Sequence, residues 1–96
     1  MTSRTRRALL FSPGDDRHKI EKGAALDVDA IIMDLEDGVA PTRKDEARAI
    51  VAQALSDVQF GNTERLVRIN PIDDDNEQWY QDLEQTLPHN PDGYVL

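Results

Sequence analysis

The sequence contains no cysteine. That absence excludes disulfide bonds, thiolate metal sites and a cysteine nucleophile, and it fits a cytoplasmic protein. Long apolar runs are also missing, since no stretch approaches the roughly 18 residues that a membrane-spanning helix needs. The run Ala8-Leu9-Leu10-Phe11 is too short for the apolar segment of a signal peptide, and Pro13-Gly14 follows at once. We therefore expect neither a membrane span nor a signal peptide.

Positive charge and aromatic residues are scarce. The chain has 11 Lys and Arg against 19 Asp and Glu, a formal net charge of −8, one Trp, two Tyr and two Phe. A nucleic-acid partner requires a basic surface that neutralises phosphates, so this balance argues against one. Arg4, Arg6 and Arg7 are bunched near the N-terminus, and we expect them to form a solvated tail.

Short apolar runs alternate with helical patterns along the chain. The expected strands are 8–11, 30–33, 65–69 and one that begins at Gly93, and the expected helices are about 17–25, from Thr42 or Asp45 to Ser56, and about 76–87. Asp15 or Asp16 is expected to cap the first helix, and Pro88 to end the third. The order βαβαβαβ with continuous apolar strands is typical of an α/β fold with a parallel sheet. The pattern alone is compatible with a barrel and with a doubly wound sheet.

The helix that ends at Ser56 has the clearest apolar stripe. The stripe consists of Ala47, Ile50, Val51, Ala54 and Leu55. We expect the opposite, solvent-facing side to carry Arg43, Lys44, Glu46, Arg48 and Gln53.

Arg68 interrupts a strand that is otherwise apolar. A guanidinium on a buried strand is costly unless an anion meets it. Near the carboxyl end of the strand, its planar fork can clamp a carboxylate of a substrate. An internal ion pair with Glu36 or Asp37 is the alternative, and both can hold together. Side chains alternate along a strand, so we expect Arg68 to share a face with Leu66 and Asn70.

Three carboxylates, Asp34, Glu36 and Asp37, follow the second expected strand. Such a cluster favours a cation, an arginine or a proton, and oxygen-rich groups suit Mg²⁺ directly or through its waters. One of the three is expected to act as a helix cap or loop anchor, and the local sequence does not say which.

Cations also lie near the loop that follows the first strand. Arg17 and Lys22 could meet a phosphate at the entrance of a site, although residues of this kind are most often solvated. We expect His18 and His89 to be surface residues, and the segment Asp73-Asp74-Asp75 to be solvated or to cap the third helix.

Four blocks stand in one order: Arg7–Asp15, Asp34–Pro41, Leu66–Pro71 and Asp92–Leu96. Together they resemble the citrate lyase β-subunit-like group of the HpcH/HpaI aldolase superfamily, which includes malyl-CoA and citramalyl-CoA lyases. The resemblance covers almost the whole chain. It implies a (β/α)₈ barrel, usually oligomeric, of which residues 1–96 form an incomplete domain that stops at the start of the fourth strand.

The resemblance also implies a chemistry. Members of this group use Mg²⁺ to cleave a β-hydroxyacyl thioester into an acyl thioester and a 2-oxo acid. Arg68 would hold the carboxylate or the enolate oxygen, with Asn70 as a further substrate-binding candidate. Glu36 and Asp37 would line the metal-water and substrate site as catalytic residues. Arg17 and Lys22 would lie near the phosphates of CoA or of an acyl-carrier protein.

In this group the direct Mg²⁺ ligands, a Glu and an Asp, come from later strands, which this chain does not contain. The resemblance therefore implies the N-terminal segment of a lyase that acts as a homo-oligomer or in a lyase complex. Two alternatives stay open: a truncated, non-catalytic chain that only binds a partner, and an aldolase of the same superfamily that acts on free acids.

Overall fold

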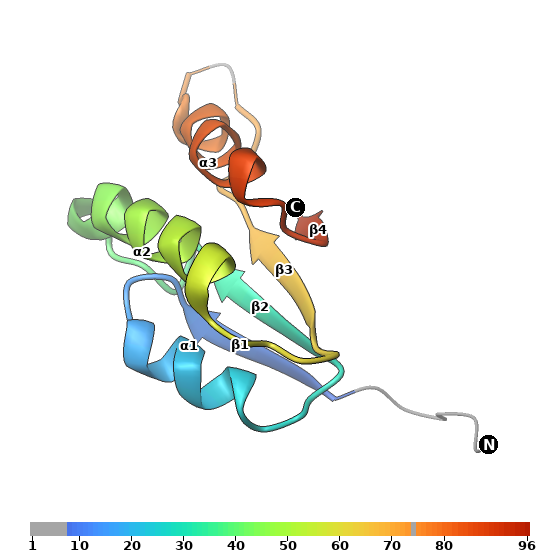
Figure 1. Ribbon diagram of the computed structural model, residues 1–96. Helices are drawn as coiled ribbons and strands as arrows, with labels where there is room; N and C mark the ends of the chain where they lie inside the picture. The colour runs from blue at the N-terminus through green and yellow to red at the C-terminus, as the bar shows by residue number, and fades with distance from the viewer. Residues whose placement is uncertain (1–7, 74) are drawn as a thin grey trace.

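The computed structural model describes residues 8–73 and 75–96 and contains one parallel sheet with helices packed against it (Figure 1). The elements in chain order are β1 (Leu9–Pro13), α1 (Arg17–Ala24), β2 (Ala30–Asp34), the 3₁₀ turn η1 (Pro41–Arg43), α2 (Lys44–Asp57), β3 (Glu64–Arg68), α3 (Gln78–Thr86), the 3₁₀ turn η2 (Leu87–His89) and β4 (Gly93–Val95). The expected tail with Arg4, Arg6 and Arg7 lies outside the described residues, as does Asp74.

The strands stand in the sheet in the order in which they occur in the sequence. All three neighbouring pairs are parallel. Figure 1 shows α1, α2 and α3 on the same side of this sheet. A doubly wound sheet would reverse its strand order and carry helices on both faces, so the described part of the chain is not doubly wound. Sequential strands with helices on one side are the arrangement of successive βα units in a barrel.

The structure confirms the expected elements and changes some of their ends. β1 extends through Pro13, which pairs in register with Asp34. Asp16 caps α1, since its carboxylate accepts a hydrogen bond of 3.0 Å from the backbone N–H of Lys19. α3 begins later than the sequence predicts, and it is followed directly by η2, which contains Pro88.

The core lies between the sheet and the helices. β2 is buried along its whole length, as its continuous apolar run predicts. The core cluster includes Ile31, Met33, Leu35, Val67 and Ile69 from the strands and their ends, and Ala47, Val51, Ala54 and Leu55 from α2. A Cβ atom at Gly23 would lie 2.8 Å from side chains of Leu10 and Ile31. Glycine at this position of α1 therefore allows the helix to approach the strands closely.

In the described part of the chain, no helix covers the other face of the sheet (Figure 1). Leu9 and Phe11 of β1 are 54% and 52% exposed there. In a closed barrel this face points to the interior, and functional groups gather where the strands end.

Arg48, which the sequence predicts on the solvent side of α2, is buried. Its guanidinium donates a hydrogen bond of 2.7 Å to Asp82 of α3, and both side chains are 0% exposed. The prediction for Arg48 is therefore wrong, because α3 packs against α2 at this point and supplies a carboxylate.

Of the two histidines expected at the surface, one is exposed and one is half-buried. His18 is exposed as expected, whereas His89 is half-buried and its ring hydrogen-bonds the hydroxyl of Ser56. Asp73 accepts a hydrogen bond of 2.9 Å from the backbone N–H of Asp75, so it holds a tight turn. Among the described residues, no helix has the length and apolar character needed to cross a bilayer.

Candidate functional site

The most prominent polar contact on the helix-free face joins the carboxyl ends of β2 and β3. Asp34 and Arg68 are register partners in the sheet. Arg68 donates to Asp34 through Nε, at 2.9 Å, and through Nη2, at 2.6 Å. This fork-on-carboxylate geometry is stronger and more directional than a single ion pair. The Arg68 side chain keeps 25% of its surface exposed, against 6% for Asp34.

Asp34 is also the anchor of the loop that follows β2. Its two carboxylate oxygens accept hydrogen bonds from the backbone N–H groups of Glu36, at 2.8 Å, and Gly38, at 2.9 Å. A Cβ atom on Gly38 would lie 2.8 Å from Asp34 Oδ2, so glycine allows the loop to close on the carboxylate. Burial would raise the pKa of Asp34, but the Arg68 hydrogen bonds and the two backbone donors outweigh it and lower that pKa. The loop anchor expected among the three carboxylates is therefore Asp34.

Glu36 also approaches Arg68. Its carboxylate is 3.7 Å from Arg68 Nε. The sequence names Glu36 or Asp37 as the internal partner of Arg68. The pair with Glu36 is present, but the shorter, two-pronged partner is Asp34. Arg68 also lies over the ring of Phe11, 5.2 Å from its centroid, in a cation–π contact that fixes the guanidinium plane.

Glu36 and Asp37 interact with each other. A hydrogen bond with Asp37, followed by burial and the charge of Asp37, raises the pKa of Glu36, while Arg68 opposes the shift. Two neighbouring carboxylates of this kind favour a bound cation. Glu36 is half-buried and Asp37 is exposed, so the pair faces solvent at the edge of the sheet.

This donor set fits a divalent cation in part. Oxygen ligands suit Mg²⁺, and Glu36 and Asp37 would hold it through its waters. Among residues 8–73 and 75–96, no group of three or more Asp, Glu or His side chains is close enough to hold a metal. Glu36 and Asp37 therefore fit a role as groups that bind the waters of a Mg²⁺ ion rather than the ion itself.

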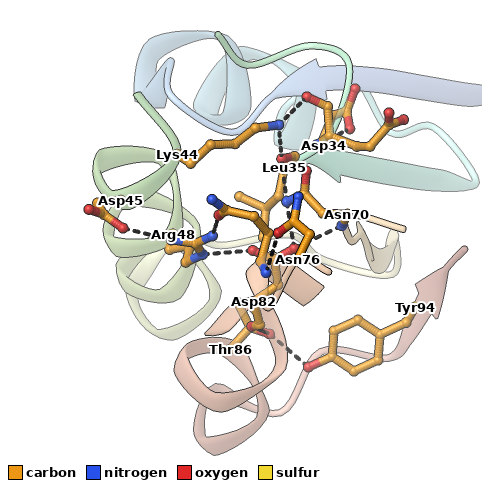
Figure 2. Close-up of polar contacts among 12 residues, drawn as sticks. Asp34, Leu35, Lys44, Asp45, Arg48, Asn70, Asn76, Asp82, Thr86 and Tyr94 are labelled. Atoms are coloured by element: carbon orange, nitrogen blue, oxygen red, sulfur yellow. Dashed lines mark hydrogen bonds and ion pairs between the residues drawn. The ribbon is translucent and has the colours of Figure 1, made fainter. Parts of the chain in front are cut away.

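Asn70 and Lys44 hold the same loop from the helix side. Asn70 Nδ2 donates to the Leu35 carbonyl at 3.0 Å and to Asp82 Oδ2 at 2.7 Å. Lys44 Nζ donates to the carbonyls of Leu35, at 2.7 Å, and Glu36, at 2.6 Å, and Figure 2 shows these groups converging on Leu35. The Asn70 amide thus points toward α3. The expectation that Asn70 shares a face with Arg68 is therefore wrong, because β3 ends at Arg68 and the strand alternation does not continue to Asn70. The predicted contact of Asn70 with substrate stays a prediction.

Sequence reasoning missed the role of Lys44, which it placed on the solvent side of α2. Its side chain is instead half-buried over the loop that follows β2. The available signal was its position, because Lys44 starts the helix directly after that loop.

The two cations expected to meet phosphates lie on α1. Arg17 donates to Asp57 at 2.6 Å and to Glu21 at 2.9 Å, so it is engaged at the end of α2. Lys22 lines a cavity of about 190 Å³ beside β1, together with Leu10 and Ser12. Neither placement tests phosphate binding. To bind a phosphate with both arms of its fork, Arg17 would have to release Asp57.

Comparison with known proteins identifies the group. Residues 7–96 match the family model described as HpcH/HpaI aldolase/citrate lyase. The mitochondrial citramalyl-CoA lyase of Rattus norvegicus is 49% identical over 67 residues, which cover 70% of this chain and 20% of that protein. The citrate lyase subunit beta of Leuconostoc mesenteroides is 40% identical over 70 residues, 73% of this chain and 23% of that protein. The chain thus spans about a fifth to a quarter of the length of these relatives.

Solved structures agree. The protein CitE of Mycobacterium tuberculosis in complex with magnesium, acetoacetate and coenzyme A is 36% identical, with a TM-score of 0.63, over 82% of this chain and 27% of that one. The predicted fold class, the βαβαβαβ half of a (β/α)₈ barrel, is confirmed by the sheet and by this similarity. The match to the family model over nearly every residue, the shared fold and the agreement among relatives lead to one conclusion: the chain belongs to the HpcH/HpaI aldolase/citrate lyase family.

Proposed function

We propose that this chain is the N-terminal segment of a Mg²⁺-dependent lyase that splits a β-hydroxyacyl thioester of the citryl, malyl or citramalyl type into an acyl thioester and a 2-oxo acid. The family and the activities named for the relatives support the reaction class. The observation that carries the proposal is the placement of Arg68, held as a rigid fork at the carboxyl edge of the sheet.

The reaction places charge where Arg68 can meet it. A base removes the proton of the β-hydroxyl, the adjacent carbon–carbon bond breaks, and its electron pair passes to the thioester as an enolate. Protonation of the enolate carbon then gives the acyl thioester. Asp34 grips one edge of the guanidinium, through Nε and Nη2, and leaves Nη1 to reach an anion. A donor that is already oriented in this way stabilises the substrate carboxylate or the enolate oxygen without reorganising.

Glu36 and Asp37 complete the proposed site. Bound Mg²⁺ would polarise the oxygens of the 2-oxo acid. The two carboxylates would orient its waters, while Asp34 and Lys44 keep the backbone that carries Glu36 in place. The same proposal assigns Arg17 and Lys22 to the phosphates of CoA or of an acyl-carrier protein, includes a homo-oligomer or lyase complex, and locates the enzyme in the cytoplasm.

The test is a substrate comparison with the complete enzyme. Citramalyl-CoA, malyl-CoA and a citryl thioester are each incubated with Mg²⁺ or with EDTA, next to the free hydroxy acids. We expect a 2-oxo acid to be released from at least one thioester, and the release to stop in EDTA. Cleavage of the free acids alone would replace the proposal with an aldolase, and no cleavage of any substrate would reject it.

A second test addresses the segment itself. Reading the transcript beyond the codon for Leu96 should show an open frame that encodes about another half-barrel or more. That frame should supply a Glu and an Asp at the ends of later strands. A stop codon at that point would favour a non-catalytic, partner-binding chain.

A further inference from the structure

The buried ion pair between Arg48 and Asp82 has no role in the proposed reaction so far. Both side chains are 0% exposed. Taking two charges out of water is expensive, and apolar side chains of the same volume are often as stabilising or more so. Stability alone is therefore a weak reason for this pair. Unlike apolar residues, an ion pair supplies directed hydrogen bonds. The hydrogen bonds of Asp82 connect the pair to Asn70.

Asp82 uses its oxygens in two directions. Oδ1 accepts from Arg48 Nε at 2.7 Å. Oδ2 accepts from both the backbone N–H of Asn70, at 2.8 Å, and its side-chain Nδ2, at 2.7 Å. Arg48 is fixed in turn by Asp45, at 2.7 Å, and by Gln78. The carboxylate can therefore hold the Asn70 amide in one orientation.

That orientation reaches the candidate site. Asn70 Nδ2 donates to the carbonyl of Leu35, the residue between Asp34 and Glu36 (Figure 2). The Leu35 N–H donates to the Arg68 carbonyl at 2.9 Å. The Leu35 backbone, next to Glu36, is thus held through its carbonyl by Asn70 and Lys44 and through its N–H by β3.

We propose that Asp82, oriented by Arg48, is a positioning residue for the Glu36–Asp37 carboxylate pair and acts through Asn70 and the Leu35 carbonyl. The inference rests on the proposed function, since it gives the pair its task. Asp82 itself touches neither substrate nor metal in this scheme, because it is fully buried between α2, α3 and the end of β3.

The test compares Asp82→Asn with Thr86→Val in the complete enzyme. An amide at position 82 must turn its NH₂ group toward Arg48 or toward Asn70, so it loses one arm of the contact. Thr86 is buried in the same cluster, where its hydroxyl donates to the Asp82 carbonyl at 2.7 Å and contacts Tyr94 Oη at 2.8 Å. Thr86→Val therefore removes a buried hydrogen bond but leaves Asp82, Asn70 and Leu35 connected.

The first readout is amide hydrogen exchange in the ligand-free protein. We expect Asp82→Asn to speed exchange of the Glu36 and Gly38 N–H groups about tenfold relative to Thr86→Val. Each variant is measured at the same interval below its own melting temperature, so that a difference in global stability does not set the result. The second readout is kinetic. Half-saturating Mg²⁺ should rise and kcat should fall, each about tenfold, in Asp82→Asn, while Thr86→Val keeps both within about twofold of the parent.

Equal exchange rates in the two variants would overturn the proposal, and so would faster exchange with unchanged kcat and Mg²⁺ dependence. If Asp82→Asn does not fold, Asn70→Ala replaces it, because that change cuts the link to Leu35 and spares the ion pair. Faster exchange of the Glu36 and Gly38 N–H groups in Asn70→Ala than in Thr86→Val would then support the proposal, and equal exchange would overturn it. A parent enzyme without thioester lyase activity would refute the proposed function alone, and exchange would still test the positioning.

Discussion

Arg68→Ala separates the structural and the catalytic consequences of one side chain. It removes both donors that Asp34 receives from β3, at 2.9 and 2.6 Å. Breaking a fully buried ion pair costs about 3–5 kcal/mol, but leaving one buried acceptor group without a partner costs about 1–3 kcal/mol. The lower range applies here, because Arg68 is 25% exposed and Asp34 keeps its hydrogen bonds from Glu36 and Gly38. We therefore expect a folded protein whose free energy of unfolding is about 1–3 kcal/mol smaller.

The catalytic loss should be larger than this. Removal of one preorganised donor to a developing oxyanion typically lowers kcat by about 10²–10³-fold, which corresponds to roughly 2.7–4 kcal/mol of transition-state stabilisation. Arg68→Lys keeps the charge but not the fork, so its activity should stay well below that of the parent. The assay is steady-state thioester cleavage with the complete enzyme, with unfolding followed by denaturant titration.

Two controls separate the effects. Arg65→Ala removes an arginine from the same strand that binds Asp92, at 3.3 Å, and the carbonyls of Leu55 and Asn90. It should lower stability and leave kcat/KM unchanged. The double variant Asp34→Asn/Arg68→Ala removes the charge that Arg68→Ala leaves on buried Asp34, but its amide can accept only one of the N–H groups of Glu36 and Gly38, so neither stability nor activity should return to that of the parent. A kcat/KM for Arg68→Ala within about tenfold of the parent, measured on folded protein, would refute the role assigned to Arg68.

Three further predictions concern the same region. Arg68 and two backbone donors lower the pKa of Asp34 despite its burial, so the contribution of Asp34 to stability should be complete above about pH 4 and be lost as the pH falls below that. Asp34→Asn should weaken the fall of the free energy of unfolding with decreasing pH, as measured by urea titrations. The same pH dependence in Asp34→Asn and in the parent would contradict the pairing. Asp37→Asn should lower the pKa of Glu36 toward its ordinary value, since the group that raises it is neutralised; a side-chain carbonyl NMR titration with an unmoved midpoint would disprove the link. Gly23→Ala should destabilise the protein by about 1 kcal/mol although alanine favours helices, because its Cβ would lie 2.8 Å from terminal methyl groups of Leu10 and Ile31, which would have to move. A raised melting temperature would show that these side chains or α1 move aside without cost.

The sequence predicts the strands, and an anionic partner for Arg68, for physical reasons that are local. A run such as Ala30–Asp34 buries on both faces of a covered parallel sheet, and a guanidinium in an apolar strand requires an anion. The identity of that anion is not local. Asp34, Glu36 and Asp37 are equivalent by composition, and only the register between β2 and β3 places Asp34 opposite Arg68.

Arg48 and Asp82 illustrate the other limit. A charged residue on a helix is normally assigned to the solvent side, which is how Arg48 was misplaced. Ala52 and Leu55 are apolar and follow Arg48 at helical spacing, so the sequence carried a signal that Arg48 lies on the buried side of α2. Its partner, however, lies in α3, and the packing of α3 on α2 that joins them depends on the tertiary structure.

The order of the strands has a consequence for synthesis on the ribosome. In the described sheet, β2, β3 and β4 each pair with the strand made immediately before them, so these three pairings join near neighbours in the sequence. Domains tend to fold from the N-terminus as they emerge, and sheets built from near neighbours avoid slow long-range closure. The bond between Arg68 and Asp34 can therefore form as soon as β3 docks on β2. The central contact of the site can thus form before β4 pairs with β3.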